Sequence, residues 1–300
     1  MKTIIATGLT SGIGLAAAGR IQSESGVRLI VGARCPRSPE VLPLDLARLS
    51  SVRTFAAAVD MRLSGSPIDG LLLNAGVQFG NVKQRTEDGF ETTFAVNHLA
   101  HYLLLRLLLP RLASGAVVVI TTSNLHDPNT NPIAPPEHAD AMQLMRGKIE
   151  NGDTQSLRAG MRAYAASKLC NLLTARALSR SAVSRQRGLT VIAFNPGFTP
   201  GTELTRGQSS AFRLPFAIAV PILGFFQRMN TVEGGGNLLA GMALARVEPP
   251  AGHFYASQVR RQLIWPDPSA LANDDAVMVK LWRDSAAIVG LASTDESDVL

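Results

Sequence analysis

The chain has 300 residues, of which 46% are hydrophobic and 17% are charged. This composition can fill one large buried core, and it excludes a chain that is disordered over most of its length. The formal net charge of +6 could favour a nucleic-acid partner, but the arginines are scattered and no basic run is interleaved with aromatic residues. We therefore expect no nucleic-acid partner, because an anionic small ligand accounts for a basic surface more simply.

Short apolar runs alternate with helical patterns along the chain. Six runs are predicted strands, at 3–7, 27–32, 41–44, 68–73, 116–121 and 189–194. The predicted helices occupy 13–23, 49–61, 90–112 and 164–184. Because the strands are continuously apolar, both faces of their sheet should be covered. The predicted fold class is α/β: a single-domain Rossmann fold over 1–300, with a doubly wound parallel sheet and helices on both faces.

Two segments depart from this alternation. The stretch 124–161 contains four prolines and is longer than an ordinary connection, so we expect an inserted loop near the active site. The stretch 202–230 contains four phenylalanines and follows a strand's carboxyl end, which favours a substrate-binding lid. An aromatic, weakly charged wall suits an apolar or polycyclic small-molecule substrate. A dimer contact or ordinary core is an equally good interpretation of the phenylalanines.

Few signals indicate a metal, a disulfide or a membrane. Cys35 and Cys170 cannot form a disulfide framework, and Cys and His are not clustered at metal-ligand spacings, so we expect no metal and a cytoplasmic location. The opening apolar run is too short for a secretory signal. The apolar stretch 214–226 contains two prolines and is shorter than the roughly 20 residues of a spanning helix. Contact with a membrane surface stays open, because Arg213 and Arg228 flank that stretch.

A glycine-rich turn links the first predicted strand to the first predicted helix. It reads Gly8-Leu9-Thr10-Ser11-Gly12-Ile13-Gly14, with the spacing G-x-x-x-G-x-G. Glycines let a backbone approach a pyrophosphate closely, and the amino end of the helix favours its charge. We expect Gly8, Thr10, Ser11, Gly12, Ile13 and Gly14 to bind a dinucleotide.

The end of the second strand predicts which dinucleotide is bound. An acidic residue there would accept hydrogen bonds from the ribose hydroxyls of NAD. The sequence has Gly32-Ala33-Arg34 instead, and the arginine side chain offers several donors to the 2'-phosphate of NADP. We therefore expect NADP(H), with an exposed arginine of no special role as the alternative.

Tyr164 and Lys168 are four residues apart on a predicted helix, so their side chains share one face. A nearby ammonium favours the phenolate, which would lower the pKa of Tyr164 from about 10 and make it a proton donor near neutral pH. In isolation this spacing more often represents a half-buried tyrosine and an exposed lysine. The other motifs of the chain favour the proton donor.

Together these motifs resemble the short-chain dehydrogenase/reductase superfamily over nearly the whole chain. The resemblance implies adenine contacts at Asp45 and Leu46, a fourth-strand motif at Asn74-Ala75-Gly76 and a nicotinamide-side loop at Pro196-Gly197, with Thr199 and Thr202 also binding the cofactor. It implies a catalytic tetrad of Asn97, Ser123, Tyr164 and Lys168. Because three hydroxyl residues are consecutive at 121–123, Thr122 remains the alternative to Ser123.

Within the superfamily the chain is most similar to the branch of light-dependent protochlorophyllide reductases and retinol-dehydrogenase-like enzymes. The runs 97–104, 167–171, 202–206 and 280–282 carry this likeness. One departure is Phe198, which stands where the pigment reductase has a functional cysteine. The resemblance implies that Ser123 stabilises the oxyanion, that Lys168 also holds the ribose hydroxyls, and that Asn97 anchors a water leading to Lys168.

Three functions fit these features. The first is an NADPH-dependent oxidoreductase that reduces a ketone, aldehyde or enone of an apolar small molecule, with Tyr164 as proton donor. The second is reduction of a carbon–carbon double bond, and the third is a non-catalytic NADPH sensor. His98 and His101 are expected to pack in the helix, whereas His126 could line the pocket. Surplus apolar residues on the two longest helices suggest a homodimer.

Overall fold

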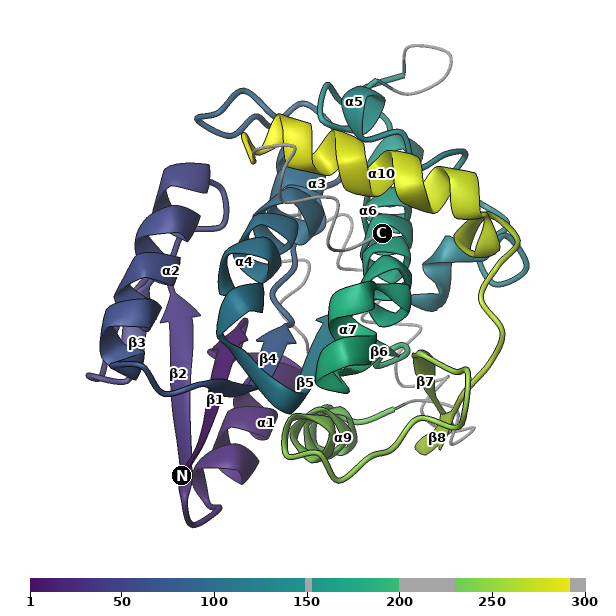
Figure 1. Cartoon of the computed structure of the whole chain (residues 1–300). Coiled ribbons are helices and arrows are strands. Elements are labelled where there is room, and N and C mark those ends of the chain that lie inside the picture. Colours follow the sequence, from purple (N-terminus) through teal and green to yellow (C-terminus); the bar gives the residue numbers. More distant parts are fainter. Residues whose placement is uncertain (149–152, 200–229, 292–300) are drawn as a thin grey trace.

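The computed structural model describes residues 1–148, 153–199 and 230–291, which form one α/β domain (Figure 1). Its strands are β1 Lys2–Thr7, β2 Val27–Ala33, β3 Val41–Pro43, β4 Ile68–Leu73, β5 Leu112–Thr121, β6 Thr190–Asn195, β7 Tyr255–Val259 and β8 Gln262–Ile264. The helices are α1 Gly12–Gln22, α2 Leu49–Leu63, α3 Thr92–Phe94, α4 Ala100–Leu108, α5 Ala141–Leu144, α6 Leu157–Arg180, α7 Ala182–Arg187, α9 Val232–Ala243 and α10 Asp275–Ile288.

The eight strands form a single sheet in the order β3-β2-β1-β4-β5-β6-β7-β8. Neighbours from β3 to β7 are parallel, and only β8 runs antiparallel to its neighbour β7. The predicted α/β class and parallel core are therefore confirmed, with β8 as the exception. The strand order reverses direction between β1 and β4, which is where sheets of this type bind ligands beyond their carboxyl ends.

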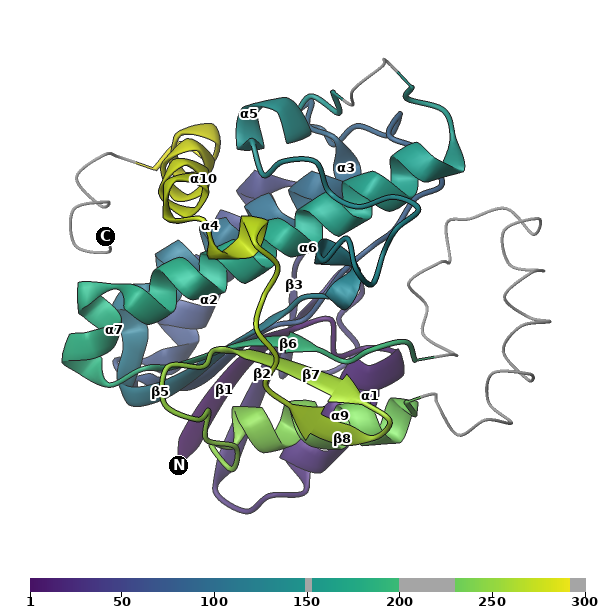
Figure 2. The same cartoon turned by 90° about the vertical axis from the view of Figure 1, so that its right-hand side faces the viewer.

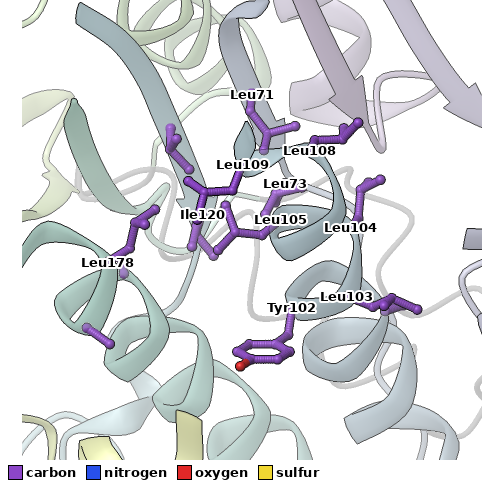
Figure 3. Packing of buried hydrophobic residues seen from close by; sticks show 14 of the residues in the cluster. Leu71, Leu73, Tyr102, Leu103, Leu104, Leu105, Leu108, Leu109, Ile120 and Leu178 are labelled. Carbon is purple, nitrogen blue, oxygen red and sulfur yellow. The ribbon is translucent and has the colours of Figure 1, made fainter. Parts of the chain in front are cut away.

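Helices cover both faces of the sheet. Figure 2 shows α2, α4 and α6 on one face and α1 with α9 on the other. On the first face, leucines of α4 pack against β4 and β5, as seen for Leu105, Leu71 and Ile120 (Figure 3). On the second face, α1 and α9 approach so closely that a Cβ on Gly236 of α9 would lie 2.5 Å from the Cβ of Ala16 in α1. Burial on both sides explains why the strands are continuously apolar.

The predicted boundaries were wrong at several places. The expected helix 90–112 is interrupted by a π-helical turn at Ala95–Leu99, and β5 already begins at Leu112. The expected helix 164–184 begins at Leu157, and a second helix, α7, follows it after Ser181. The sequence prediction missed α9, β7 and β8, since the two strands are short and α9 is rich in glycine.

Helix α10 forms a further layer outside α4 and α6 (Figure 2). Its Trp282 is buried and meets Tyr102 of α4 edge to face, with 5.0 Å between ring centroids. The apolar surplus of the long helices, from which a homodimer was expected, is thus covered within the same chain. A homo-oligomer remains a prediction, but this surplus gives it no separate support.

The expected lid falls almost entirely outside the described residues, as do its phenylalanines. The inserted segment is described in part, and contains a 3-10 turn at Asn124–His126 and the short helix α5. Across the described ranges, no helix is both long and apolar enough to cross a membrane. No group of three or more His, Cys, Asp or Glu residues that could hold a metal ion occurs in the same ranges.

Two histidines are buried in the helical segment that precedes β5. Burial lowers the pKa of His98 to about 3 and that of His101 to about 4, from an ordinary value of 6.5. Both rings are therefore neutral at physiological pH, as expected for imidazoles that have lost their hydration.

These buried rings should make the fold sensitive to mild acid. Because the unfolded chain binds protons below pH 6.5 and the folded rings do not, their contribution is complete above pH 6.5 and is lost as the pH falls toward 4. Each ring should add a slope of about 1.4 kcal/mol per pH unit to the free energy of unfolding. Urea denaturation between pH 7 and 5 should show a shallower slope for His98→Gln than for the wild type. Equal slopes would contradict the neutral assignment of His98.

Candidate active site

The glycine turn closes tightly against the loop that follows β4. Gly8 has a φ of +70°, and a Cβ there would lie 2.5 Å from the Cα of Ala75. A Cβ on Gly14 would lie 1.9 Å from the carbonyl oxygen of Gly8. Only glycine fits either position, so the turn keeps its backbone open toward the carboxyl edge of the sheet.

The amino end of α1 fits the pyrophosphate of a dinucleotide. Ser11 is the N-cap residue, but its side chain makes no capping hydrogen bond, and the first turn contains no acidic residue. The first backbone N–H groups of the helix and its dipole can therefore act on an external anion. Thr10 and Ser11 lie at this end on the surface, whereas Ile13 is buried against α9.

Asn74 links the turn to the neighbouring strand ends. Its Nδ2 donates to the carbonyl oxygen of Gly8 at 3.0 Å, and its Oδ1 accepts from Thr121 Oγ1 at 2.9 Å. The N–H groups of Asn74 and Ala75 donate to Thr7 Oγ1 at 3.1 and 3.2 Å. The half-buried Gly76 follows directly. Three of the predicted motifs therefore meet at the ends of β1, β4 and β5.

The residues that are expected to bind the adenosine part of the coenzyme lie just after β2 and β3. Arg34 follows β2 directly and is exposed, and it makes no hydrogen bond or ion pair with the described residues. Asp45 and Leu46 are half-buried after β3, and Asp45 Oδ1 accepts from the N–H of Ala47 at 3.0 Å. The guanidinium of Arg34 is thus available to an external anion.

Tyr164 and Lys168 share one face of α6, as their spacing predicted. Both are buried, and the Nζ atom of Lys168 lies 5.6 Å from the centroid of the Tyr164 ring. Nζ donates to the carbonyl oxygen of Thr121 at 3.1 Å, which ties α6 to the end of β5. Asn171 Nδ2 donates to the same carbonyl at 3.1 Å, a contact that the sequence analysis did not single out.

Burial sets the pKa values of this pair. It lowers the pKa of Lys168 to about 8 and raises the pKa of Tyr164 above its ordinary value of 10. The expectation that Lys168 lowers the pKa of Tyr164 is not met, because loss of hydration outweighs an ammonium directed at the Thr121 carbonyl. Tyr164 therefore holds its proton, and no described residue forms a hydrogen bond with its hydroxyl.

Asn97 lies in the π-helical turn and joins three segments. Its Oδ1 accepts from the N–H of Val77 at 2.8 Å, and its Nδ2 donates to the carbonyl of Val77 at 2.9 Å and to Ser167 Oγ at 3.0 Å. Both amide hydrogens of Asn97 are therefore committed to partners within the fold, and its backbone carbonyl oxygen lies 3.1 Å from His101 Nδ1. The π turn, an extra residue in the helix, commonly occurs at functional sites.

The hydroxyl groups of Ser123 and Thr122 have different surroundings. Thr122 Oγ1 donates to the carbonyl of Lys168 at 2.7 Å and is buried. Ser123 Oγ accepts from the N–H of Leu125 at 3.3 Å, and it donates to no other described residue. His126 fixes the Ser123 backbone, since its Nδ1 lies 2.7 Å from the Ser123 carbonyl oxygen. His126 thus packs behind the serine, with its ring edge-to-face against Tyr255.

The segment after β6 is secured by Asn230, which no motif in the sequence had indicated. Asn230 Nδ2 donates to the carbonyls of Pro196 at 3.0 Å and Gln258 at 2.7 Å. Gly197 has a φ of +66°, and a Cβ there would lie 2.3 Å from Asn230 Nδ2. Thr199 is buried beside this turn, whereas Thr202 lies outside the described residues. Asn230 therefore ties the loop after β6 to Gln258 of β7.

Comparison with known proteins agrees with this geometry. A family model described as short chain dehydrogenase matches residues 2–133. Protochlorophyllide reductase A, chloroplastic, from Oryza sativa subsp. japonica is 31% identical over 324 residues, which cover 96% of this chain and 80% of that protein. A Streptomyces sp. (strain C5) protein, provisionally named daunorubicin C-13 ketoreductase, is 30% identical over 96% of this chain and 93% of its own length.

A solved structure shows the same fold. The crystal structure of an uncharacterized protein from Mycobacterium Paratuberculosis superposes with a TM-score of 0.68 at 26% sequence identity, covering 97% of this chain and 94% of that one. The sheet order, the glycine turn and these similarities agree, and the chain belongs to the short-chain dehydrogenase/reductase superfamily of oxidoreductases, in a branch similar to the protochlorophyllide reductases.

Proposed function

We propose that the protein is an NADPH-dependent oxidoreductase that transfers a hydride to a carbonyl group of an apolar small molecule. The substrate would be a ketone, aldehyde or enone, in some cases polycyclic. The observation that carries this proposal is the buried pair of Tyr164 and Lys168, fixed at the carboxyl end of β5 next to Ser123. A buried proton donor beside a buried cation has no use in a domain that only binds a nucleotide, so a non-catalytic sensor is disfavoured.

The residues proposed to hold the coenzyme surround this pair. The glycine turn and the amino end of α1 would bind the pyrophosphate, and Arg34 would bind the 2'-phosphate. The remaining proposed contacts are Asp45, Leu46, Asn74, Ala75, Gly76, Tyr164, Lys168, Pro196, Gly197, Thr199 and Thr202. When bound, the reduced nicotinamide supplies the hydride.

The side chains would supply the proton and the electrostatic stabilisation. Tyr164 Oη gives its proton to the substrate oxygen, and its raised pKa keeps that proton in place until negative charge develops there. Ser123 donates a hydrogen bond to the same oxygen. Lys168 has a pKa of about 8 and is therefore mostly protonated at pH 7. Its positive charge stabilises the phenolate that forms when Tyr164 gives up its proton. Asn97 presents its backbone carbonyl to a water that reaches Lys168.

Reduction of a carbon–carbon double bond is the second candidate. It is favoured by the identity of 31% to a protochlorophyllide reductase over 96% of the chain. The half-exposed Phe198, in the place where the pigment enzyme is expected to have a cysteine, weakens this candidate. The same Tyr164 could serve either reaction, since both need a proton after hydride transfer.

A substrate panel tests the proposed function. We expect the protein to oxidise NADPH in the presence of apolar ketones, aldehydes or enones, as followed by absorbance. Product analysis with an enone separates the candidates, because carbonyl reduction gives an allylic alcohol and double-bond reduction gives a saturated ketone. If the protein binds NADPH but turns over none of the substrates in the panel, both reductase candidates are contradicted and a non-catalytic NADPH sensor is supported.

Tyr164→Phe removes the proposed proton donor but keeps the ring. We expect turnover to fall by at least about 10²-fold, the usual contribution of a general acid, with NADPH affinity changed little. Lys168→Ala should damage both turnover and NADPH affinity. Tyr102→Phe is the matched control, because that buried hydroxyl donates to the carbonyl of Trp282 in α10. It should lower stability without lowering turnover; near-normal turnover in Tyr164→Phe would refute the assignment.

The choice between Ser123 and Thr122 can be tested in the same assay. Ser123→Ala should lower kcat by about 10²-fold, as loss of an oxyanion donor does. Thr122→Val should chiefly lower the melting temperature, because it breaks a buried hydrogen bond to the Lys168 carbonyl. The reverse result would assign the catalytic hydroxyl to Thr122.

Arg34→Glu tests the coenzyme preference. The substitution replaces the guanidinium that is proposed to donate hydrogen bonds to the 2'-phosphate. The new carboxylate would repel a phosphate and accept hydrogen bonds from ribose hydroxyls. We expect the NADPH dissociation constant to rise by at least about tenfold, equivalent to about 1.4 kcal/mol, and that of NADH to fall. Arg283→Glu on the exposed face of α10 is the control for the same reversal of charge. Wild-type protein that binds NADH more tightly than NADPH would overturn the preference.

A further inference from the structure

His101 lies where the coenzyme turn meets the π-helical turn, and both of its ring nitrogens have partners. Nε2 is 2.9 Å from Thr7 Oγ1, and Nδ1 is 3.1 Å from the backbone carbonyl oxygen of Asn97. The ring is only 2% exposed, although the surrounding helix is apolar. A polar ring on such a helix costs free energy unless its hydrogen bonds are made.

The partners of Thr7 determine the tautomer. Thr7 Oγ1 already accepts from the N–H groups of Asn74 and Ala75, which uses both of its lone pairs. Its hydroxyl hydrogen is then free to be donated to His101 Nε2, while the contact to the Leu72 carbonyl, at 3.5 Å, is at the limit for a hydrogen bond. Nε2 is therefore the acceptor, and the ring proton lies on Nδ1, from which it is donated to the Asn97 carbonyl.

The electrostatic surroundings favour the same neutral form. Burial, with a smaller contribution from the positive charge of Lys168, lowers the pKa of His101 to about 4. A charged ring would also have to donate from Nε2 to an oxygen that has no lone pair left. The ring thus has one donor and one acceptor at fixed ends, and its orientation cannot be reversed without breaking both bonds.

We propose that His101 is a positioning residue that couples the coenzyme turn, through Thr7, to the backbone carbonyl of Asn97. This inference rests on the proposed function, in which the Asn97 carbonyl holds a water that reaches Lys168. Through Nε2, the imidazole fixes the Thr7 hydroxyl on which the turn and the Asn74 loop converge. Through Nδ1, it fixes the direction of the Asn97 carbonyl.

The two bonds can be removed separately, because amide side chains imitate different parts of imidazole. In His101→Gln an amide oxygen can replace Nε2 as the acceptor for Thr7, whereas in His101→Asn an amide N–H can replace Nδ1 as the donor to Asn97. His101→Leu removes both. We expect His101→Leu to raise the NADPH dissociation constant and to lower kcat, each by about tenfold, which is the usual effect of a lost buried hydrogen bond. Gln should restore NADPH affinity, and Asn should restore kcat.

Tyr102→Phe serves as the control here as well. Tyr102 is the next residue in the chain and equally buried, and its hydroxyl donates to the carbonyl of Trp282 in α10 at 2.8 Å. Tyr102→Phe should lower the melting temperature and leave the NADPH dissociation constant and kcat unchanged. If His101→Leu and Tyr102→Phe both change only the melting temperature, His101 is a packing residue and the proposal is overturned. Failure of both Gln and Asn to restore either quantity would also overturn it.

The tautomer of His101 can be tested by spectroscopy, independently of the proposed function. Nitrogen NMR of protein labelled at its five histidines should show His101 as a neutral ring protonated at Nδ1 between pH 8 and 6. A ring protonated at Nε2 would overturn the proposal, even if NADPH is bound. If the wild type binds NADPH but reduces no carbonyl compound, the proposed function fails, and the binding constants with the NMR result still decide the role of His101.

Discussion

The bond on which the site most depends joins the Lys168 ammonium to the Thr121 carbonyl at the end of β5. It holds a buried cation at 3.1 Å from one oxygen, and no carboxylate among the described residues pairs with that cation. Burial lowers the pKa of Lys168 to about 8, so keeping the charge costs the folded state free energy. Proteins retain such an arrangement where a charge is needed for chemistry, because an apolar side chain of the same volume would stabilise the core better.

Parallel strands bring the partners of this cation together. Sheet order places β5 next to β4, and the Thr121 side chain then reaches Asn74, which in turn holds the carbonyl of Gly8. On the helical side, Asn97 donates to Ser167 Oγ, which in turn donates to the carbonyl of Tyr164. Each of these polar groups is at least half-buried and paired, so a displaced member would leave its partner without a hydrogen bond, and this gives the network one geometry.

The largest surprise concerns the tyrosine. Helical spacing correctly placed Tyr164 beside Lys168, yet burial raises the pKa of Tyr164, whereas the cation was expected to lower it. Spacing determines which side chains are neighbours, but it does not determine how much water surrounds them. Hydration, and the direction of the ammonium toward Thr121, are decided by elements that lie far apart in the sequence. The same limitation applies to the apolar helices, whose surplus surface is covered by α10 rather than left for a partner.

The sequence by itself determined the α/β class, the six parallel strands, the glycine turn and the pairing of Tyr164 with Lys168, because all of these follow from short-range periodicity and spacing. Tertiary structure alone decided where helices end, that β7 and β8 extend the sheet, and that Thr122 is committed to the Lys168 carbonyl. It also decided that Asn230 secures the loop after β6 and that His101 faces Thr7. These contacts join residues as far as 94 positions apart. No local pattern encodes them, since they arise only when the sheet brings distant strand ends to one edge.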